Sequence, residues 1–217
     1  MSQHSLPNRL WYNFLRMIVQ IAAVLVFRVR HTGQKNIPSQ GGVLVVPNHQ
    51  SHLDPPLAGM GCRRHMNYIA RQSLFDFAPF AWLIWSINAI PIDREGFGIA
   101  GIKESLRRLK RGEMVLIFPE GTRTPDGKIK QFRPGITSLA VRSRAAILPV
   151  GIAGAFQCWP KSRTFPRPGR IRVHYGRPIL PQEYEGLNEQ ELISLVEYRV
   201  RQCHALVLRQ LGKSSPS

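Results

Sequence analysis

Val43 to Asp54 reads VLVVPNHQSHLD, a short apolar run followed directly by a polar loop. The apolar run, Val43 to Val46, predicts a buried β-strand. His49 is therefore expected just beyond the carboxyl end of that strand. Asp54 follows after four intervening residues and is the first acidic residue of the chain. The stretch thus joins a core strand to a titratable base and a carboxylate.

Apolar runs of this kind recur along the chain and alternate with helical patterns. Ser51 is predicted to cap a helix over 52–60, and Asn188 with Glu191 to begin the last helix. Pro91 is predicted to mark an edge or irregular position in its strand. Further strands are predicted at 67–70, 89–93, 114–118, 147–152 and 171–175, and further helices at 74–85, 99–109 and 136–144. The last helix has a predicted core stripe of Leu192, Val196, Val200, Cys203 and Val207. Strands that alternate with helices predict one layered α/β domain with a mainly parallel central sheet flanked by helices, over residues 33–217.

Composition describes a globular protein with a strong positive charge. The 217 residues are 43% hydrophobic, and 30 Lys and Arg outnumber 13 Asp and Glu for a net charge of +17. This balance attracts polyanions, so nucleic acid and anionic lipid surfaces are both candidate partners. The cysteines Cys62, Cys158 and Cys203 have no CxxC spacing and are predicted to be buried thiols in a reducing compartment.

The N-terminal segment, residues 1–32, is apolar from Leu10 to Phe27 and is predicted to form a helix that associates with a membrane. Its uninterrupted apolar part is too short to span a bilayer, and Arg16 interrupts the first half. Aromatic residues and flanking arginines favour a helix lying at the headgroup boundary over a plain core helix. No cleavage site follows, so a secretory signal is not expected.

The spacing of His49 and Asp54 predicts a general base. If the chain turns into a helix after His49, Asp54 returns to the same side about one turn later and can accept a hydrogen bond from the imidazole. That contact fixes the tautomer and makes the other ring nitrogen a base for a hydroxyl proton. His52 leaves a second interpretation open, in which His49, His52 and Asp54 are ligands of a metal ion, although the usual spacings of metal motifs are absent.

A second motif, FPEGTR at 118–123, closes another predicted strand. Gly121 allows close approach of a ligand to the backbone, and Arg123 offers a planar fork for a phosphate. Arg94 ends the preceding strand and is predicted on the same rim, whereas Lys103 and Arg133 are weaker candidates. The chain has no GxSxG nucleophile motif, so direct attack by a substrate hydroxyl is favoured over a covalent acyl-enzyme.

In their order along the chain, four blocks resemble the glycerophospholipid acyltransferases, most closely the bacterial 1-acylglycerol-3-phosphate acyltransferase group. The blocks are His49 with Asp54, residues 92–94 (IDR), residues 118–123 (FPEGTR) and residues 147–150 (ILPV). The second block departs from the family pattern, because Asn88 to Pro91 stand where a glycine and an aromatic residue are usual.

The resemblance implies an O-acyltransferase of phospholipid biosynthesis that works without a cofactor. His49 would deprotonate the free hydroxyl of 1-acylglycerol 3-phosphate, glycerol 3-phosphate or another lysolipid, with Asp54 as its orienting partner. The donor would be acyl-CoA or acyl carrier protein. With 1-acylglycerol 3-phosphate as the acceptor, the product would be phosphatidic acid. The acyl chain would lie along residues 74–85. The implied phosphate and glycerol pocket consists of Arg94, Glu120, Gly121, Thr122 and Arg123.

The same resemblance implies a protein associated with the cytoplasmic face of a membrane, pressed onto anionic lipid by its charge. Lys161, Arg163, Arg167, Arg170 and Arg172 occupy a stretch without acidic residues, which is either a membrane or carrier-protein contact or a solvated basic face. Two rival functions differ in class. A nucleic-acid binder explains the charge but leaves the His and Asp pair unused, and a metal-dependent hydrolase leaves the arginines unused.

Overall fold

The computed structural model describes residues 17, 21, 24–71, 90–92 and 99–212. The predicted helix over 74–85, the residue Arg94 and most of the predicted N-terminal helix lie outside these residues. The described part of the N-terminal helix, at Met17, Ile21 and 24–27, is helical. No described helix is both long enough and apolar enough to cross a membrane.

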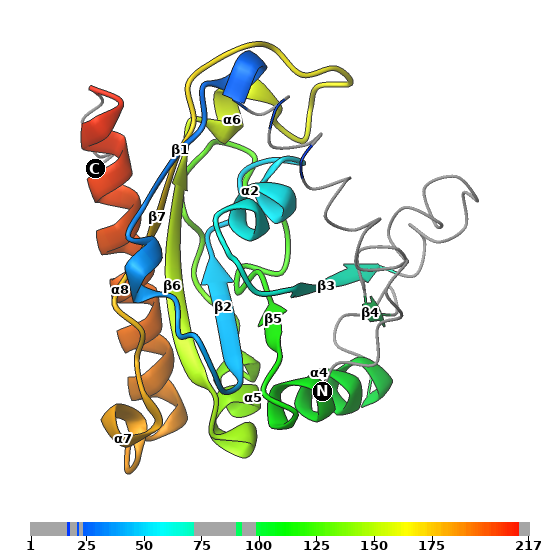
Figure 1. Cartoon of the computed structure of the whole chain (residues 1–217), viewed down its shortest axis with the longest axis vertical. Coiled ribbons are helices and arrows are strands. Elements are labelled where there is room, and N and C mark those ends of the chain that lie inside the picture. Colours follow the sequence, from blue (N-terminus) through cyan, green and yellow to red (C-terminus); the bar gives the residue numbers. More distant parts are fainter. Residues whose placement is uncertain (1–16, 18–20, 22–23, 72–89, 93–98, 213–217) are drawn as a thin grey trace.

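The described residues form one sheet of seven strands, which is mainly parallel as predicted (Figure 1). Its strands are β1 (Arg30–Thr32), β2 (Val43–Pro47), β3 (Met66–Arg71), β4 (Ile90–Ile92), β5 (Met114–Leu116), β6 (Ala146–Ala153) and β7 (Arg172–Tyr175). Their order is β1-β7-β6-β2-β5-β3-β4, and β6 with β7 is the one antiparallel pair. β4, which carries Pro91, is an edge strand as predicted, whereas β1 is a strand within the segment predicted as membrane-associating.

The described helices are η1 (Gln34–Asn36), α2 (Asp54–Met60), α4 (Ile99–Lys110), α5 (Ile136–Ser143), α6 (Ala155–Cys158), α7 (Pro181–Tyr184) and α8 (Glu189–Gln210). Among them, α4, α5 and α8 lie where helices were predicted, α2 begins later than predicted, and η1, α6 and α7 were not predicted. Asn188 and Glu191 form a reciprocal cap on α8, as predicted. The predicted Ser51 cap is wrong. The helix begins only at Asp54, and Ser51 Oγ instead accepts from Leu53 N and donates to the carbonyl of Trp159.

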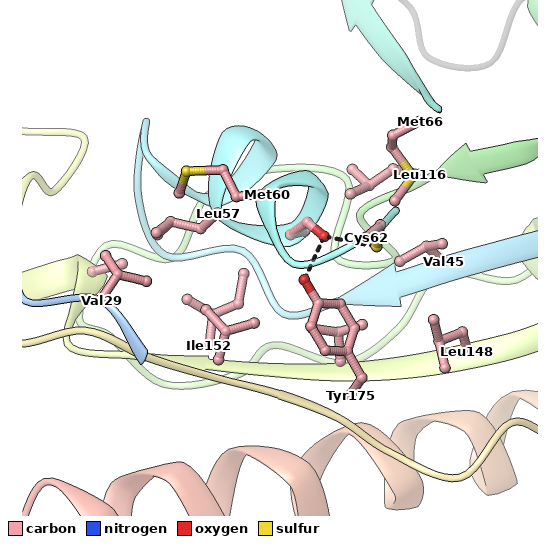
Figure 2. Close-up of a cluster of buried hydrophobic side chains, with 14 of the residues drawn as sticks. Val29, Val45, Leu57, Met60, Cys62, Met66, Leu116, Leu148, Ile152 and Tyr175 are labelled. Carbon is pink, nitrogen blue, oxygen red and sulfur yellow. Dashed lines mark hydrogen bonds between the residues drawn. The ribbon is translucent and has the colours of Figure 1, made fainter. Parts of the chain in front are cut away.

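β2 is buried on both faces, which explains its unbroken apolar sequence. Val43 and Val45 face one core cluster, under α2, and Leu44 and Val46 face another, under α4, α5 and α8. Figure 2 shows the first cluster, where the hydroxyl of Tyr175 donates to the carbonyl of Ala58 at 2.8 Å. Two helical layers therefore enclose the sheet.

α8 lies against β6 and β7 and contributes its predicted stripe to the core. Leu192, Val196, Val200, Cys203 and Val207 are all buried. Gly151 permits this close packing, because a Cβ there would lie 2.3 Å from the backbone of Cys203. Cys62, Cys158 and Cys203 are buried thiols, as predicted.

Three loops that matter for function meet at one edge of the sheet. The loops after β2 and β5 leave the carboxyl ends of parallel neighbours. The segment between β6 and β7 lies at the same edge, because β6 runs parallel to β2 and β7 returns antiparallel. In open parallel sheets this edge is where ligands bind.

Candidate active site

His49 and Asp54 form a hydrogen-bonded pair at the carboxyl end of β2. His49 Nδ1 lies 2.9 Å from Asp54 Oδ2, and Asp54 is fully buried. The imidazole stacks on the ring of Phe118, with centroids 3.7 Å apart and planes 16° apart. Because an ionised carboxylate only accepts hydrogen bonds, Nδ1 carries the proton and Nε2 is left as the basic nitrogen.

The backbone of the loop holds the same carboxylate oxygen. Asp54 Oδ2 also accepts from the N–H groups of Gln50 at 2.5 Å and Ser51 at 2.6 Å. Charge-assisted hydrogen bonds of this kind are stronger than neutral ones. On the other side of the loop, the carboxamide of Asn48 exchanges two hydrogen bonds with the backbone of Ile152 in β6. The His49 imidazole is therefore held in a turn that is hydrogen-bonded on both sides.

Glu120, which belongs to the FPEGTR motif, holds this turn through hydrogen bonds to its carboxyl group. One carboxylate oxygen accepts from His49 N at 2.6 Å and the other from Lys130 N at 2.9 Å. Only 3% of Glu120 is exposed, and this burial raises the pKa of its carboxyl to about 7, although the hydrogen bonds from the Lys130 and His49 N–H groups act in the opposite direction. Both oxygens are engaged with backbone, so Glu120 holds the loop that carries His49; its predicted contact with substrate stays a prediction.

The turn after Glu120 carries Arg123 and packs against the side chain of Arg133. Gly121 has a φ of +68°, which favours glycine, and a Cβ there would lie 2.6 Å from Arg133 Nε. The carbonyl of His49 accepts from Thr124 N at 2.9 Å, so Gly121, Thr122 and Arg123 are held beside the base. Arg133, a weaker candidate in the sequence, packs directly on this turn.

His52 lies at the open side of the turn, against Trp159, with ring centroids 5.1 Å apart. Partial burial lowers the pKa of His52, and the positive charge of Arg123 lowers it further. Arg123 and His52 are therefore electrostatic neighbours. No group of three or more His, Cys, Asp or Glu side chains that could hold a metal ion occurs in the part of the chain described by the structure.

Gln50 and His204 belong to the support of the site, and sequence reasoning missed both. The Gln50 amide nitrogen lies 3.0 Å from His204 Nε2, on α8, and donates to the carbonyl of Gly127 at 3.3 Å. His204 lies on the core side of α8, and burial with the nearby charge of Arg201 lowers its pKa to about 4. The sequence signal for His204 was its position next to Cys203, among the apolar residues of the stripe predicted for the last helix.

The site thus brings together His49, Asp54, Glu120 and the Gly121–Arg123 turn from two predicted motifs. A model of the Acyltransferase family matches residues 28–153, which contain all of these residues. The chain therefore belongs to the Acyltransferase family and is an O-acyltransferase.

Individual relatives agree with this assignment. The chain is 33% identical over 180 residues to a 1-acyl-sn-glycerol-3-phosphate acyltransferase of Pseudomonas aeruginosa, covering 81% of this chain and 67% of the relative. It is 25% identical over 192 residues to a Bacillus subtilis protein of the same name, covering 88% and 94%. The crystal structure of the 1-acyl-sn-glycerophosphate acyltransferase PlsC from Thermotoga maritima superposes with a TM-score of 0.80 at 30% identity, covering 92% of this chain and 81% of that one.

Proposed function

We propose that this enzyme transfers a fatty acyl group to the free hydroxyl of 1-acyl-sn-glycerol-3-phosphate and so makes phosphatidic acid. The names of its relatives give the acceptor and the reaction. The observation that carries the mechanism is the 2.9 Å contact between His49 Nδ1 and the buried Asp54, which leaves Nε2 for the substrate.

In the proposed reaction, His49 Nε2 removes the proton from the acceptor hydroxyl as its oxygen attacks the thioester carbonyl of the donor. Asp54 balances the charge of the imidazolium that forms. The tetrahedral intermediate then expels the thiolate of the donor, which takes the proton back from His49. The ester bond forms as the thioester bond breaks, and no acyl-enzyme intermediate or cofactor is required.

The acceptor phosphate is assigned to the turn after Glu120. Arg123 provides a planar guanidinium that is an electrostatic neighbour of His52, and Arg133 packs against Gly121 in the turn. Arg94 is proposed for the same pocket from the resemblance of its sequence block. Two guanidinium charges at this turn fit a phosphomonoester better than a neutral lipid head.

The donor is proposed to be acyl-CoA or acyl carrier protein, and the enzyme to work at the cytoplasmic face of an anionic membrane. The net charge of +17 favours such a surface. In the described end of the N-terminal helix, apolar side chains are exposed, and Leu25 is 74% exposed. Both features suit an enzyme whose acceptor and product are lipids.

The test is acyl transfer by the purified full chain with lysophosphatidic acid, glycerol 3-phosphate and other lysolipids, each against acyl-CoA and acyl carrier protein. We expect His49→Ala to abolish turnover and to keep its circular dichroism spectrum, whereas His174→Ala, the same change on β7, keeps turnover. A folded His49→Ala protein with near-normal turnover would refute the base. Acyl transfer that requires stoichiometric zinc or iron would overturn the metal-free mechanism proposed here.

A further inference from the structure

The segment between α6 and β7 is a basic loop with an exposed aromatic side chain. We call residues 159–170 the basic loop. No acidic residue occurs between Asp126 and Glu183, and the loop carries Lys161, Arg163, Arg167 and Arg170. Phe165 belongs to this loop and is 76% exposed. An exposed aromatic side chain in a cationic loop suits a surface that contacts lipid headgroups.

Hydrogen bonds across its base give the basic loop a defined shape. Arg167 N donates to the carbonyl of Cys158 at 2.8 Å, which closes the loop. The Trp159 indole donates to the carbonyl of Arg163 at 3.0 Å, and Arg163 Nη1 donates to that of Gln157 at 3.2 Å. Phe165 is therefore presented by a closed turn rather than by an open chain.

The basic loop contacts the turn after β2, which carries His49 and Asp54. Ser51 Oγ donates to the carbonyl of Trp159 at 2.6 Å, and the Trp159 ring lies against His52. Figure 1 shows the loop, in yellow, at the same end of the sheet as α2. The basic loop, which carries Phe165, thus lies at the same end of the molecule as His49 and Asp54.

The end of the N-terminal helix adjoins the basic loop. Gly169 N donates to the carbonyl of Val26 at 3.3 Å, and Ile171 N to that of Phe27 at 3.0 Å. In the same helical turn, Val24, Leu25 and Val26 all expose their side chains. Apolar and cationic groups therefore form one continuous surface beside the active site.

We infer that the basic loop and Val24–Val26 together dock the enzyme on an anionic bilayer, with Phe165 inserted at the headgroup boundary and the arginines on lipid phosphates. The inference rests on the proposed lipid acceptor, which has to reach the dyad from a membrane. An acidic carrier protein would satisfy the arginines but would leave Phe165 and Leu25 in water. Cations flanking exposed apolar side chains are typical of an interfacial site.

Vesicle sedimentation of the full chain tests the docking surface. Vesicles of phosphatidylcholine with phosphatidylglycerol are compared with vesicles of phosphatidylcholine alone. We expect Phe165→Ser to weaken binding to the anionic vesicles by about 10-fold or more. Arg167→Ala with Arg170→Ala should weaken it roughly 20-fold and reduce its salt dependence, since each surface cation contributes about 5-fold. The matched control is Lys35→Ala with Arg111→Ala, which removes two exposed cations from the opposite end of the sheet.

Turnover in detergent micelles separates this proposal from the proposed function. The docking variants should keep wild-type kcat on micellar lysophosphatidic acid and lose activity on vesicles. Wild-type vesicle binding by both loop variants would overturn the docking surface. Normal vesicle binding with a selective loss of turnover from acyl carrier protein would assign the loop to the carrier instead. If no lysolipid is acylated in any assay, the proposed function fails, whereas vesicle binding still decides the docking.

Discussion

Gln50 Nε2 and His204 Nε2 lie 3.0 Å apart, although 154 residues separate them along the chain. The Gln50 amide nitrogen also donates to the carbonyl of Gly127, so His204 Nε2 is the acceptor and its ring is neutral. The backbone N–H of the same Gln50 donates to the carboxylate that holds His49. α8 therefore supports the turn that carries His49 through the buried side chain of Gln50.

The buried His204 should make stability depend on pH. Its pKa of about 4 in the folded protein lies below its ordinary value of 6.5, so the unfolded chain binds the proton first. The stabilisation is complete above pH 6.5 and is lost as pH falls from 6.5 to 4, by up to about 1.4 kcal/mol per pH unit. In His204→Gln, which retains a polar amide, this part of the pH dependence should disappear.

Urea unfolding of both proteins between pH 4 and 7.5 measures the effect. The free energy of unfolding of the wild type minus that of His204→Gln should decrease as pH falls through the window. A difference that is constant with pH would show that His204 does not stay neutral in the fold.

Asp54→Asn should lower kcat by about 10²- to 10⁴-fold with little change in the KM for either substrate. The amide oxygen can still accept from Gln50 N and Ser51 N, so the turn is kept. The negative charge that balances the His49 imidazolium is lost. Steady-state kinetics of Asp54→Asn beside Glu185→Gln, an exposed control, measure the effect. A kcat within 3-fold of the wild type would exclude the dyad mechanism.

Arg123→Ala should raise the KM for lysophosphatidic acid by about 10- to 100-fold, because a charge-assisted hydrogen bond contributes about 1.5–3 kcal/mol. kcat should change much less. The effect should be small for monoacylglycerol, an acceptor without the phosphate, and absent in Arg111→Ala. An equal rise in KM for both acceptors would assign Arg123 to the support of the turn instead of to the phosphate.

Glu120→Gln should destabilise the fold by about 1–3 kcal/mol at acidic pH. Both carboxyl oxygens of Glu120 accept a hydrogen bond from a backbone N–H, and in the variant one of these N–H groups would face the glutamine NH₂, which cannot accept it. The raised pKa of Glu120 gives the sign of the pH effect. The stability contributed by its bound proton is present below pH 4.5 and is lost as pH rises through about 7. The advantage of the wild type over Glu120→Gln should therefore be larger at pH 4.5 than at pH 7.5 in denaturant titrations. An advantage that grows with pH would contradict the raised pKa.

Local sequence patterns predicted the elements that are buried on both faces or bear a clear stripe. The run from Val43 to Val46, the apolar positions of α8 and the Asn188 cap are examples, because burial and capping leave their periodicity in the residues themselves. Short elements were missed. β1, α6 and α7 have three or four residues each, too few for a period to appear.

The His49–Asp54 pair could also be predicted from local sequence, because the two residues are only five positions apart and one turn of the chain brings them together. The sequence by itself determined this pair, the class of fold and the acyltransferase blocks. Only the tertiary structure decided what holds the pair in place: Glu120 under His49, Asn48 on Ile152, and His204 against Gln50. These contacts join residues 71 to 154 positions apart. No spacing encodes them, because they form only when the sheet closes and α8 packs across β6.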